Sequence, residues 1–351
     1  MAREPAVIAG WGVGGVNVKG ALVEPGAGFP AGARTVVRPF EVWRGRELLP
    51  DVLRDVAEEL GISAGTPLAL TMTAELSDAF RDKREGVLFV VDAVAAAFPH
   101  SPGFALDVRG EFAPLGEAHE RPLEFAATNW VASALVAAAR LGDCILVDVG
   151  STTTDIVPVR GGRLACEGHT DLERLAAGEL VYTGVVRTNP NTLARTVPVR
   201  GRPCRVAAEH FAVMGDAYVL LGRLDASAYT SPTPDGREVS PSACGERLAR
   251  LVCGDRETLA ERERVAIAGY LVERQLQVIG EGLLQVVSRW EGPEEPRIAA
   301  AGAGAFVAAE VAGRLGLDVV PAASTWAGAG VALPAAAAAW LLAERLTGEL
   351  S

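Results

Sequence analysis

The stretch from Cys144 to Pro158 constrains the fold more than any other part of the chain. Apolar residues run into Asp148, a Gly-Ser-Thr-Thr-Thr turn follows, and Asp155 opens a second apolar run. This pattern predicts a buried strand, a tight polar loop and a returning strand. A buried strand that ends on a carboxylate is costly unless something occupies the loop. The hairpin therefore indicates a binding site as well as a fold.

The loop of this hairpin has the groups that hold a phosphate and its metal. Backbone amides in such a turn form a concave nest for anions, and the hydroxyls add further donors. Asp148 can hold Mg²⁺ directly or through water. We predict that the phosphate-binding residues are Gly150, Ser151, Thr152 and Thr153. The alternative is a hairpin whose hydroxyls bond only their own backbone, but the symmetric placement of Asp148 and Asp155 around the loop favours a binding site.

The length, charge and cysteines of the chain limit its class. Its 351 residues suggest two domains, and a hydrophobic content of 49% is enough for sizeable cores. The net charge of −11 disfavours a nucleic-acid partner, which needs a basic surface. No charge-free apolar run is long enough to span a membrane, and the first residues carry no secretion signal. Five cysteines without a CxxC pair indicate reduced thiols, so we expect a cytoplasmic protein without membrane partners.

A second glycine turn occurs near the N-terminus. Positions 10, 12 and 15 fit the dinucleotide-binding spacing GxGxxG, which requires a following helix. The residues from Val16 to Val23 instead alternate and stop at Pro25, which predicts a strand and hence a β-hairpin. With Lys19 just beyond its tip, this hairpin is either a second phosphate site or simply a tight turn, and its residues alone do not decide between the two.

Two candidate binding residues follow predicted elements of the first half. A strand over 67–71 runs toward Glu75, and ligands usually lie at the carboxyl edge of such sheets. Glu75 is therefore a candidate for binding a cation or a substrate amine, or else an acid favoured at a helix N-terminus. Asn129 opens a predicted helix that ends at Arg140, and it either caps this helix or faces a cleft.

The residues after the central hairpin add further candidates. A capping box predicts a helix from Thr170, and Asp171, Arg174 and Glu179 remain free for chemistry. The segment 178–188, which contains Tyr182, sets polar groups in an apolar frame and suits a substrate loop.

The rest of the chain predicts a loop, two helices and a third glycine turn. Residues 229–241 are rich in Pro, Ser and Thr and predict an exposed loop. A long helix is expected over about 258–290. The glycine turn at 302–304 follows a short strand, and it lets backbone approach a flat or anionic ligand closely. The last helix, from 335 to 346, is expected to pack back on the first domain.

These elements predict two α/β domains. The first covers residues 1–141 and is joined by the C-terminal helix 334–351. The second covers residues 142–333, and it carries the phosphate hairpin 146–157 and the glycine turn 302–304.

The three glycine turns, ordered along two α/β halves, resemble the plan of the actin-like ATPase superfamily, which has the ribonuclease H-like fold. One family within this superfamily is more similar. The shared motifs are TMTAEL (71–76), EGV (85–87), NW (129–130), VDVGSTTTD (147–155), GELVYTG (178–184), RLAR (247–250) and GAG (302–304). On these motifs the chain resembles, from about residue 7 to 330, the hydantoinase/oxoprolinase-related proteins linked to tetrahydromethanopterin C1 transfer.

The resemblance implies a transferase of methanofuran or methylofuran biosynthesis. Such an enzyme joins an aminomethylfuran methyl diphosphate to a γ-glutamyltyramine phenol and releases diphosphate. Mg²⁺ would be its cofactor, ATP would not be required, and a homodimer is one assembly that the resemblance allows. The first alternative is an ATP-dependent hydantoinase/oxoprolinase-like or kinase-like enzyme. The second is a non-catalytic paralogue that binds a component of the C1 pathway.

The resemblance also implies roles for single residues. Asp148, Asp155 and Lys19 would be catalytic, with one of the two carboxylates accepting the phenol proton. Gly14, Gly15 and Asn17 would join the second hairpin loop in binding phosphate. The substrate-binding residues would be Glu75, Asn129, Asp171, Glu179, Tyr182, Gly302 and Gly304.

The first hairpin departs from the family pattern. The family reads Asp-Ile-Gly-Gly-Ala-Asn-Thr-Lys where this chain reads Gly-Val-Gly-Gly-Val-Asn-Val-Lys from Gly12 to Lys19. Gly12 replaces a carboxylate, and this loss predicts weaker Mg²⁺ binding because few protein ligands hold that ion. His169 stands where the family has Arg. Both departures favour a slower, differently specific or non-catalytic relative.

Overall fold

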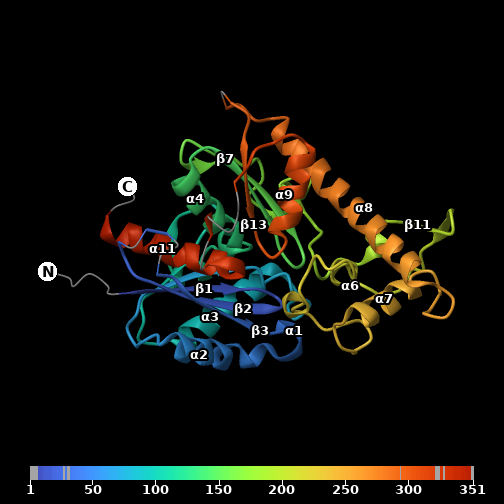
Figure 1. The fold of residues 1–351 in the computed structure, drawn as a ribbon. Helices are drawn as coiled ribbons and strands as arrows, with labels where there is room; N and C mark the ends of the chain where they lie inside the picture. Colours follow the sequence, from blue (N-terminus) through green and yellow to red (C-terminus); the bar gives the residue numbers. More distant parts are fainter. Residues whose placement is uncertain are drawn as a thin grey trace.

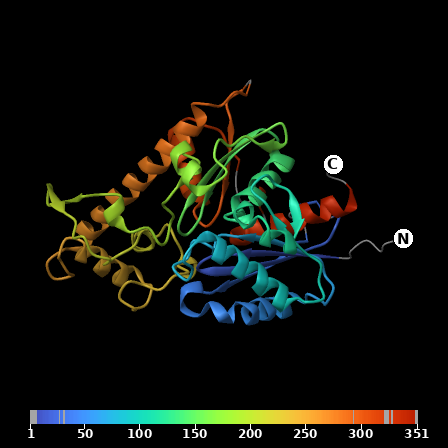
Figure 2. The ribbon, with the colours of Figure 1, turned by 180° about the vertical axis from the view of Figure 1, so that it is seen from behind.

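Two β-sheets, one in each half of the chain, form the body of the molecule (Figures 1 and 2). The structure is a computed structural model that describes residues 7–26, 28–29, 32–292, 294–320, 325–326 and 329–348. Within this part of the chain, no helix combines the length and apolar character that crossing a membrane requires.

The first sheet has the strand order β3-β2-β1-β4-β5-β6. Its strands are β1 (Ile8–Val13), β2 (Asn17–Val23), β3 (Arg34–Pro39), β4 (Leu68–Met72), β5 (Gly103–Leu106) and β6 (Phe112–Pro114). Strands β1 and β2 form an antiparallel hairpin, and β4 and β5 extend the sheet parallel to β1. The first glycine turn is therefore the tip of a β-hairpin, as the alternation after it predicted.

The second sheet has the order β10-β8-β7-β13-β14, with β9 paired to β8. Its strands are β7 (Cys144–Val149), β8 (Thr154–Arg160), β9 (Arg163–Leu164), β10 (Leu180–Val181), β13 (Arg297–Ala301) and β14 (Val319–Val320). Here β7 and β8 form the antiparallel hairpin, and β13 and β14 run parallel to β7. Both sheets thus repeat one plan, in which a hairpin has an antiparallel strand on one side and two parallel strands on the other. The expected two-domain α/β fold of the actin-like type is confirmed.

Helices form layers between and outside the two sheets (Figure 1). Helices α2 (Leu49–Leu60) and α3 (Lys83–Ala97) cover the outer face of the first sheet. Helices α4 (Asn129–Leu141) and α11 (Leu333–Thr347) lie in the layer that both sheets share. Helices α8 (Glu261–Val287) and α9 (Ala305–Arg314) cover the far face of the second sheet.

Helix α11 returns from the second half and packs directly on β1. Its alanines from 335 to 339 are fully buried. A Cβ at Gly10 would lie only 1.9 Å from the carbonyl oxygen of Ala335, so a glycine is required where the helix crosses the strand. The C-terminal helix therefore packs against the first sheet, although it follows the second half in the sequence.

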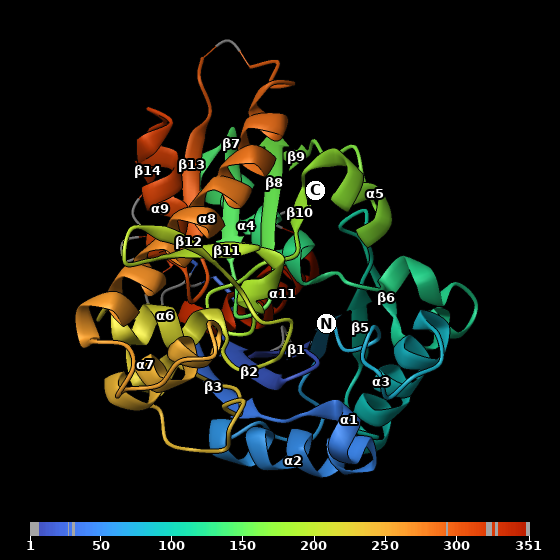
Figure 3. The ribbon, with the colours of Figure 1, turned by 90° about the vertical axis from the view of Figure 1, so that its right-hand side faces the viewer.

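The remaining elements are short, and most of them form a lobe beside α8 (Figure 3). The lobe contains β11 (Thr196–Val199), β12 (Arg202–Arg205), α6 (Met214–Leu220) and α7 (Pro241–Arg250). Elsewhere, α1 (Val42–Gly45) follows β3, and α5 (Asp171–Ala177) begins with the predicted capping box at Thr170. Turns of 3-10 helix lie at 46–48, 115–119, 122–125, 190–192, 226–228 and 330–332.

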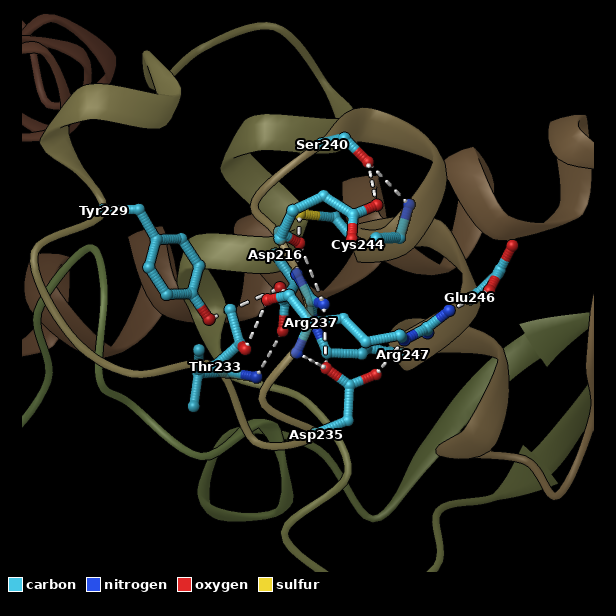
Figure 4. Close-up of polar contacts among 12 residues, drawn as sticks. Asp216, Tyr229, Thr233, Asp235, Arg237, Ser240, Cys244, Glu246 and Arg247 are labelled. Atoms are coloured by element: carbon cyan, nitrogen blue, oxygen red, sulfur yellow. Dashed lines mark hydrogen bonds and ion pairs between the residues drawn. The ribbon is translucent and has the colours of Figure 1, made fainter.

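A buried polar network fastens the loop 229–241 to the lobe (Figure 4). Arg247 and Asp216 form an ion pair of 2.8 Å, and both side chains are fully buried. Arg247 also bonds Asp235 of the loop at 3.1 Å, and the Tyr229 hydroxyl donates to Asp216 at 3.4 Å. The prediction of an exposed loop is wrong for these residues, because their polar groups find partners on α6 and α7. Burial raises the pKa of the nearby Cys244 thiol to about 12, so this thiol stays protonated at neutral pH.

Candidate functional site

The two hairpin tips meet where the two sheets face each other. Lys19 of β2 interacts electrostatically with both Asp148 and Asp155 of the second hairpin. Burial lowers the pKa of the Lys19 ammonium, and the two carboxylates oppose this effect. We call this place the hairpin junction, and we define it as residues 12–19 together with residues 148–155. The three residues predicted to be catalytic lie in it.

Asp148 is the open carboxylate of the junction. Its side chain is 9% exposed, and burial followed by the charge of Asp155 raises its pKa to about 6. Lys19 acts in the opposite direction, and it does so through space rather than through an ion-pair contact. Gly302, with φ of +81°, packs against this carboxylate, since a Cβ there would lie 2.2 Å from Asp148 Oδ1. A buried acid with so little compensation favours a bound cation.

Asp155 has a different role from Asp148. It forms an ion pair of 3.0 Å with Arg174, whose side chain is 1% exposed. The Arg174 guanidinium also lies 4.1 Å from the ring centroid of Trp130 and donates to the carbonyl oxygen of Glu179. Burial raises the pKa of Asp155, and Arg174 opposes the rise. Asp155 and Arg174 therefore compensate each other's charge, so the prediction that Arg174 is free for chemistry is wrong, whereas the catalytic role of Asp155 stays a prediction.

Glu179 and Gly304 are also engaged within the protein. Glu179 is fully buried, and its carboxylate accepts the amides of Glu167 (2.7 Å) and Gly168 (3.0 Å) and the guanidinium of Arg289 (2.6 Å). Gly304 is buried, and its amide donates to the carbonyl oxygen of Val149 at 2.8 Å. These bonds engage both residues within the protein, and their substrate contacts stay predictions.

The remaining substrate candidates lie around the junction. Asp171 forms an ion pair of 2.5 Å with Lys83 of α3, which connects the two halves. Asn129 is half-buried at the start of α4. Tyr182 is 59% exposed at the end of β10.

The two hairpin loops, which are predicted to bind phosphate, are closed by backbone hydrogen bonds. The Gly150 amide donates to the carbonyl oxygen of Thr153 at 2.8 Å, and residues 150–153 are half-buried. In the first hairpin the Gly14 amide donates to the carbonyl oxygen of Asn17 at 2.9 Å. The side chain of Asn17 is 7% exposed, and its Oδ1 has no hydrogen-bond partner among the described residues. Such an unpaired buried acceptor is rare and indicates a group that a ligand satisfies.

Two further unpaired groups lie at the carboxyl end of β4. Glu75 is 2% exposed, and no described residue offers a hydrogen bond to its Oε2. Burial raises its pKa to about 7 and Asp171 adds to the rise, while hydrogen bonds from the amides of Glu75 and Ala127 and the charge of Lys83 oppose it. Thr128, whose amide bonds the carbonyl oxygen of Met72 at 3.1 Å, has a buried hydroxyl that is likewise unpaired within the described ranges. These groups line one edge of the first sheet together with the first hairpin, as the position of Glu75 predicted.

The carboxylate that the junction offers is suited to Mg²⁺ that is also coordinated by a phosphate of the ligand. The described residues contain no group of three or more His, Cys, Asp or Glu side chains that could hold a metal alone. Mg²⁺ commonly binds through one or two carboxylates plus substrate phosphates, and Asp148 offers one such carboxylate. Gly12 has room for a Cβ, because the nearest atoms, on Lys19, Ala335 and Thr71, would lie 3.6–3.7 Å from it.

Two residues beside the junction were not among the predicted sites. Arg187 lies next to the second hairpin loop, and its guanidinium is 5.3 Å from the ring centroid of Trp43 in the other half. The polar segment 178–188 contained a signal for Arg187. No pattern around Trp43 distinguishes it from a core residue, and its importance depends on the partner that folding brings to it.

Comparisons with known proteins agree with the motifs. The model of the family described as Hydantoinase/oxoprolinase matches residues 68–344. The chain is 36% identical over 252 residues to the (4-{4-[2-(γ-L-glutamylamino)ethyl]phenoxymethyl}furan-2-yl)methanamine synthase of Methanocaldococcus jannaschii, covering 72% of this chain and 74% of that protein. It is 33% identical over 148 residues to the synthase of the same name from Methanococcus vannielii, covering 42% of this chain and 66% of that protein.

A solved structure of low sequence identity shares the fold. The nucleotide-free structure of acetone carboxylase, from a study of ATP-dependent acetone carboxylation, superposes with a TM-score of 0.56 at 12% identity. The match covers 94% of this chain and 70% of that chain. At this identity the likeness concerns the arrangement of the two sheets alone.

Proposed function

The chain belongs to the hydantoinase/oxoprolinase family, and from this membership we propose that it is an enzyme that joins an aminomethylfuran methyl diphosphate to the phenol of γ-glutamyltyramine. The product is the furan ether named in its relatives, and diphosphate is released. The observation that carries the proposal is the 36% identity to a synthase of that ether over 72% of the chain. The same relatives do not favour a kinase or a non-catalytic paralogue.

The proposed reaction is a substitution at the furan-bound methylene carbon. A bond forms between this carbon and the phenol oxygen, while the bond from the carbon to the diphosphate oxygen breaks. The electron pair leaves with the diphosphate, and the phenol proton passes to a base. The protein therefore has to stabilise a leaving anion and to provide a proton acceptor.

The hairpin junction is suited to the leaving group. Lys19 supplies a point charge from the first hairpin, and the amides and hydroxyls of residues 150–153 supply donors from the second. Asp148 would hold Mg²⁺, which supplies further neutralisation of the diphosphate when it is bound. Asn17 offers an acceptor to a ligand-bound water or hydroxyl at the same tip.

Glu75 is the proton acceptor that the geometry supports. Its Oε2 is buried and unpaired among the described residues, whereas Asp155 is occupied by Arg174. With a pKa of about 7, Glu75 is largely ionised slightly above neutral pH and then accepts a proton efficiently. Asp148 is left for the metal.

The test is turnover with a synthetic aminomethylfuran methyl diphosphate, tyramine or γ-glutamyltyramine, and Mg²⁺. We expect the ether by mass spectrometry, with one diphosphate released for each ether and no change when ATP is omitted. Asp148→Asn should lose the activity, and Asp92→Asn, an exposed carboxylate on α3, should keep it. Turnover that requires ATP and yields ADP would favour the ATP-dependent alternative instead.

A further inference from the structure

Arg187 lies directly on the phosphate loop of the second hairpin. The amides of Val186 and Arg187 donate to the carbonyl oxygen of Ser151 at 3.1 and 2.8 Å. Gly184 packs so closely on this loop that a Cβ would lie 2.5 Å from the Thr152 amide nitrogen. The backbone of Arg187 is therefore fixed against the predicted phosphate loop.

A network behind the segment 183–188 holds it in place. The hydroxyls of Thr183 and Thr188 are 3.0 Å apart, and buried Gln275 of α8 donates to Thr183 Oγ1 at 2.7 Å. Gly215 at the start of α6 donates its amide to the carbonyl oxygen of Val186 at 3.0 Å. Buried and fully paired networks of this kind rigidify a segment, so the position of Arg187 is set independently of a ligand.

The side chain of Arg187 reaches the other half of the molecule. Its guanidinium carbon lies 5.3 Å from the ring centroid of Trp43 in α1. Helix α1 is tied to the tip of the first hairpin, because the Val42 amide donates to the carbonyl oxygen of Gly15 at 3.1 Å. The cation thus lies between the two hairpin tips. Within the described part of the chain, no carboxylate pairs with it.

Arg223 shows what a stacked arginine looks like when it is structural. Its guanidinium lies over the rings of Tyr218 and Phe306, and it also pairs with the carboxylate of Glu310. Arg187 has the aromatic partner without a carboxylate from the described residues. Its planar donors are therefore available to an anion at the junction.

We propose that Arg187 binds the diphosphate group between the two hairpin tips, with Trp43 as the residue that positions its guanidinium. The inference deepens the proposed function, on which it rests, by naming the cation that recognises the leaving group. A guanidinium presents paired donors that match phosphate oxygens, while Lys19 contributes a single point charge. The stack on Trp43 makes the anion site depend on both halves of the molecule.

The test is calorimetric titration of the full chain with inorganic diphosphate and Mg²⁺. Arg187→Gln should weaken binding by about tenfold to hundredfold, the loss expected for a charge-assisted hydrogen bond. Arg187→Lys should weaken it by about threefold to tenfold, because the charge remains and the fork is lost. Arg223→Gln, which changes another stacked arginine, should bind like the wild type. Binding by Arg187→Gln within about twofold of the wild type would overturn the proposal.

The role of Trp43 is tested separately. Trp43→Ala should weaken diphosphate binding by about threefold and Trp43→Phe should restore it, in line with the strength of a partly exposed cation–π contact. In the Arg187→Gln background Trp43→Ala should have no further effect. An additional loss in that background would contradict the positioning role.

Nucleotide binding separates this inference from the proposed function. If ADP binds more tightly than inorganic diphosphate and Arg187→Gln loses both, Arg187 remains the diphosphate ligand and the ATP-dependent alternative replaces the proposed reaction. If the wild type binds neither, the assignment of Arg187 fails.

Discussion

The two hairpins occupy equivalent places in the two sheets but carry opposite charges. Gly12 pairs with Lys19 across β1 and β2, and Asp148 pairs with Asp155 across β7 and β8. In each hairpin, this pair of residues is the second pair of the two strands counted from the hairpin tip. Gly12 therefore corresponds to Asp148, and Lys19 corresponds to Asp155. The same backbone plan therefore brings a cation from one half and two carboxylates from the other.

The pKa shifts of Lys19 and Asp148 indicate why the two hairpins carry opposite charges. Burial lowers the pKa of Lys19 and raises that of Asp148, so both charged forms are disfavoured. Each side offsets the other through space rather than through an ion-pair contact. A phosphate would compensate Lys19, and a cation would compensate Asp148. The junction is thus arranged for a charged ligand and its metal, and stability is not its purpose.

The largest expected effect distinguishes the two acids of the second hairpin. Asp155→Asn should lower the free energy of unfolding by about 3–5 kcal/mol, because it leaves buried Arg174 without its charge partner. The double variant Asp155→Asn/Arg174→Met should recover most of this loss, since it removes the uncompensated charge. Denaturant unfolding measures both. Equal stability of Asp155→Asn and the wild type would mean that the pair is not structural.

Asp148→Asn should have the opposite profile. The folded pKa of Asp148, about 6, is raised above its unfolded value, so the stability linked to its protonation is present at low pH and is lost as the pH rises through about 6. The asparagine variant should therefore melt at or above the wild-type temperature at pH 8. Activity should fall by roughly 10²–10³-fold, as for a lost electrostatic stabiliser. A large drop in melting temperature at pH 8 would contradict this assignment.

Glu75→Gln tests the acid that belongs to neither hairpin. We expect a loss of about 10²-fold in kcat at pH 8, because the base that accepts the phenol proton is removed. The rate of the wild type should increase as the pH rises through about 7, and the rate of the variant should not show this increase. The raised pKa also predicts that the variant gains stability over the wild type as the pH rises from about 4.5 to about 7, by roughly 1–3 kcal/mol in total, and that the difference stays constant at higher pH. If the variant keeps the same increase in rate with pH, the increase is due to the ionisation of another group.

Gly12→Asp makes the first hairpin more like the second and should have the smallest effect. The position has space for a Cβ, and its φ is not positive, so we expect the protein to fold. The added carboxylate should tighten the Mg²⁺ dependence of activity by about threefold to tenfold, as a second acidic ligand does.

The control for Gly12→Asp lies two residues earlier on the same strand. Gly10→Ala should fail to fold stably, because its Cβ would meet the carbonyl oxygen of Ala335 at 1.9 Å. A folded Gly12→Asp protein with unchanged Mg²⁺ dependence would mean that the first hairpin does not contact the metal.

Local patterns were enough to predict much of the fold. Alternation after the first glycine turn predicted β2, and the apolar runs around Asp148 predicted β7 and β8. The capping box predicted the start of α5, because its two bonds join residues only three apart. Each of these features depends on neighbours in the sequence, and the periodicity of side chains reports such neighbours directly.

These local patterns could not predict contacts between residues that are distant in the sequence. Glu179 and Asp155 appeared as free acids in the sequence, yet each is satisfied by an arginine that folding places beside it. The loop 229–241 appeared exposed because its composition is polar, whereas Arg247 bonds its Asp235 and Asp216 accepts from its Tyr229. A polar residue is free for chemistry only if no other element satisfies it, and that is decided by packing.

The sequence by itself determined two β-hairpins, their glycine tips and the acids and lysine that they carry, since these follow from short-range order along strands and turns. Only the tertiary structure decided which of these charges the protein itself compensates. It paired Asp155 with Arg174, left Glu75 Oε2 without a hydrogen-bond partner among the described residues, and set Arg187 against Trp43 between the hairpin tips. The physical reason is that the ionisation and availability of a buried charge depend on its neighbours in space, and the two sheets supply those neighbours from distant parts of the chain.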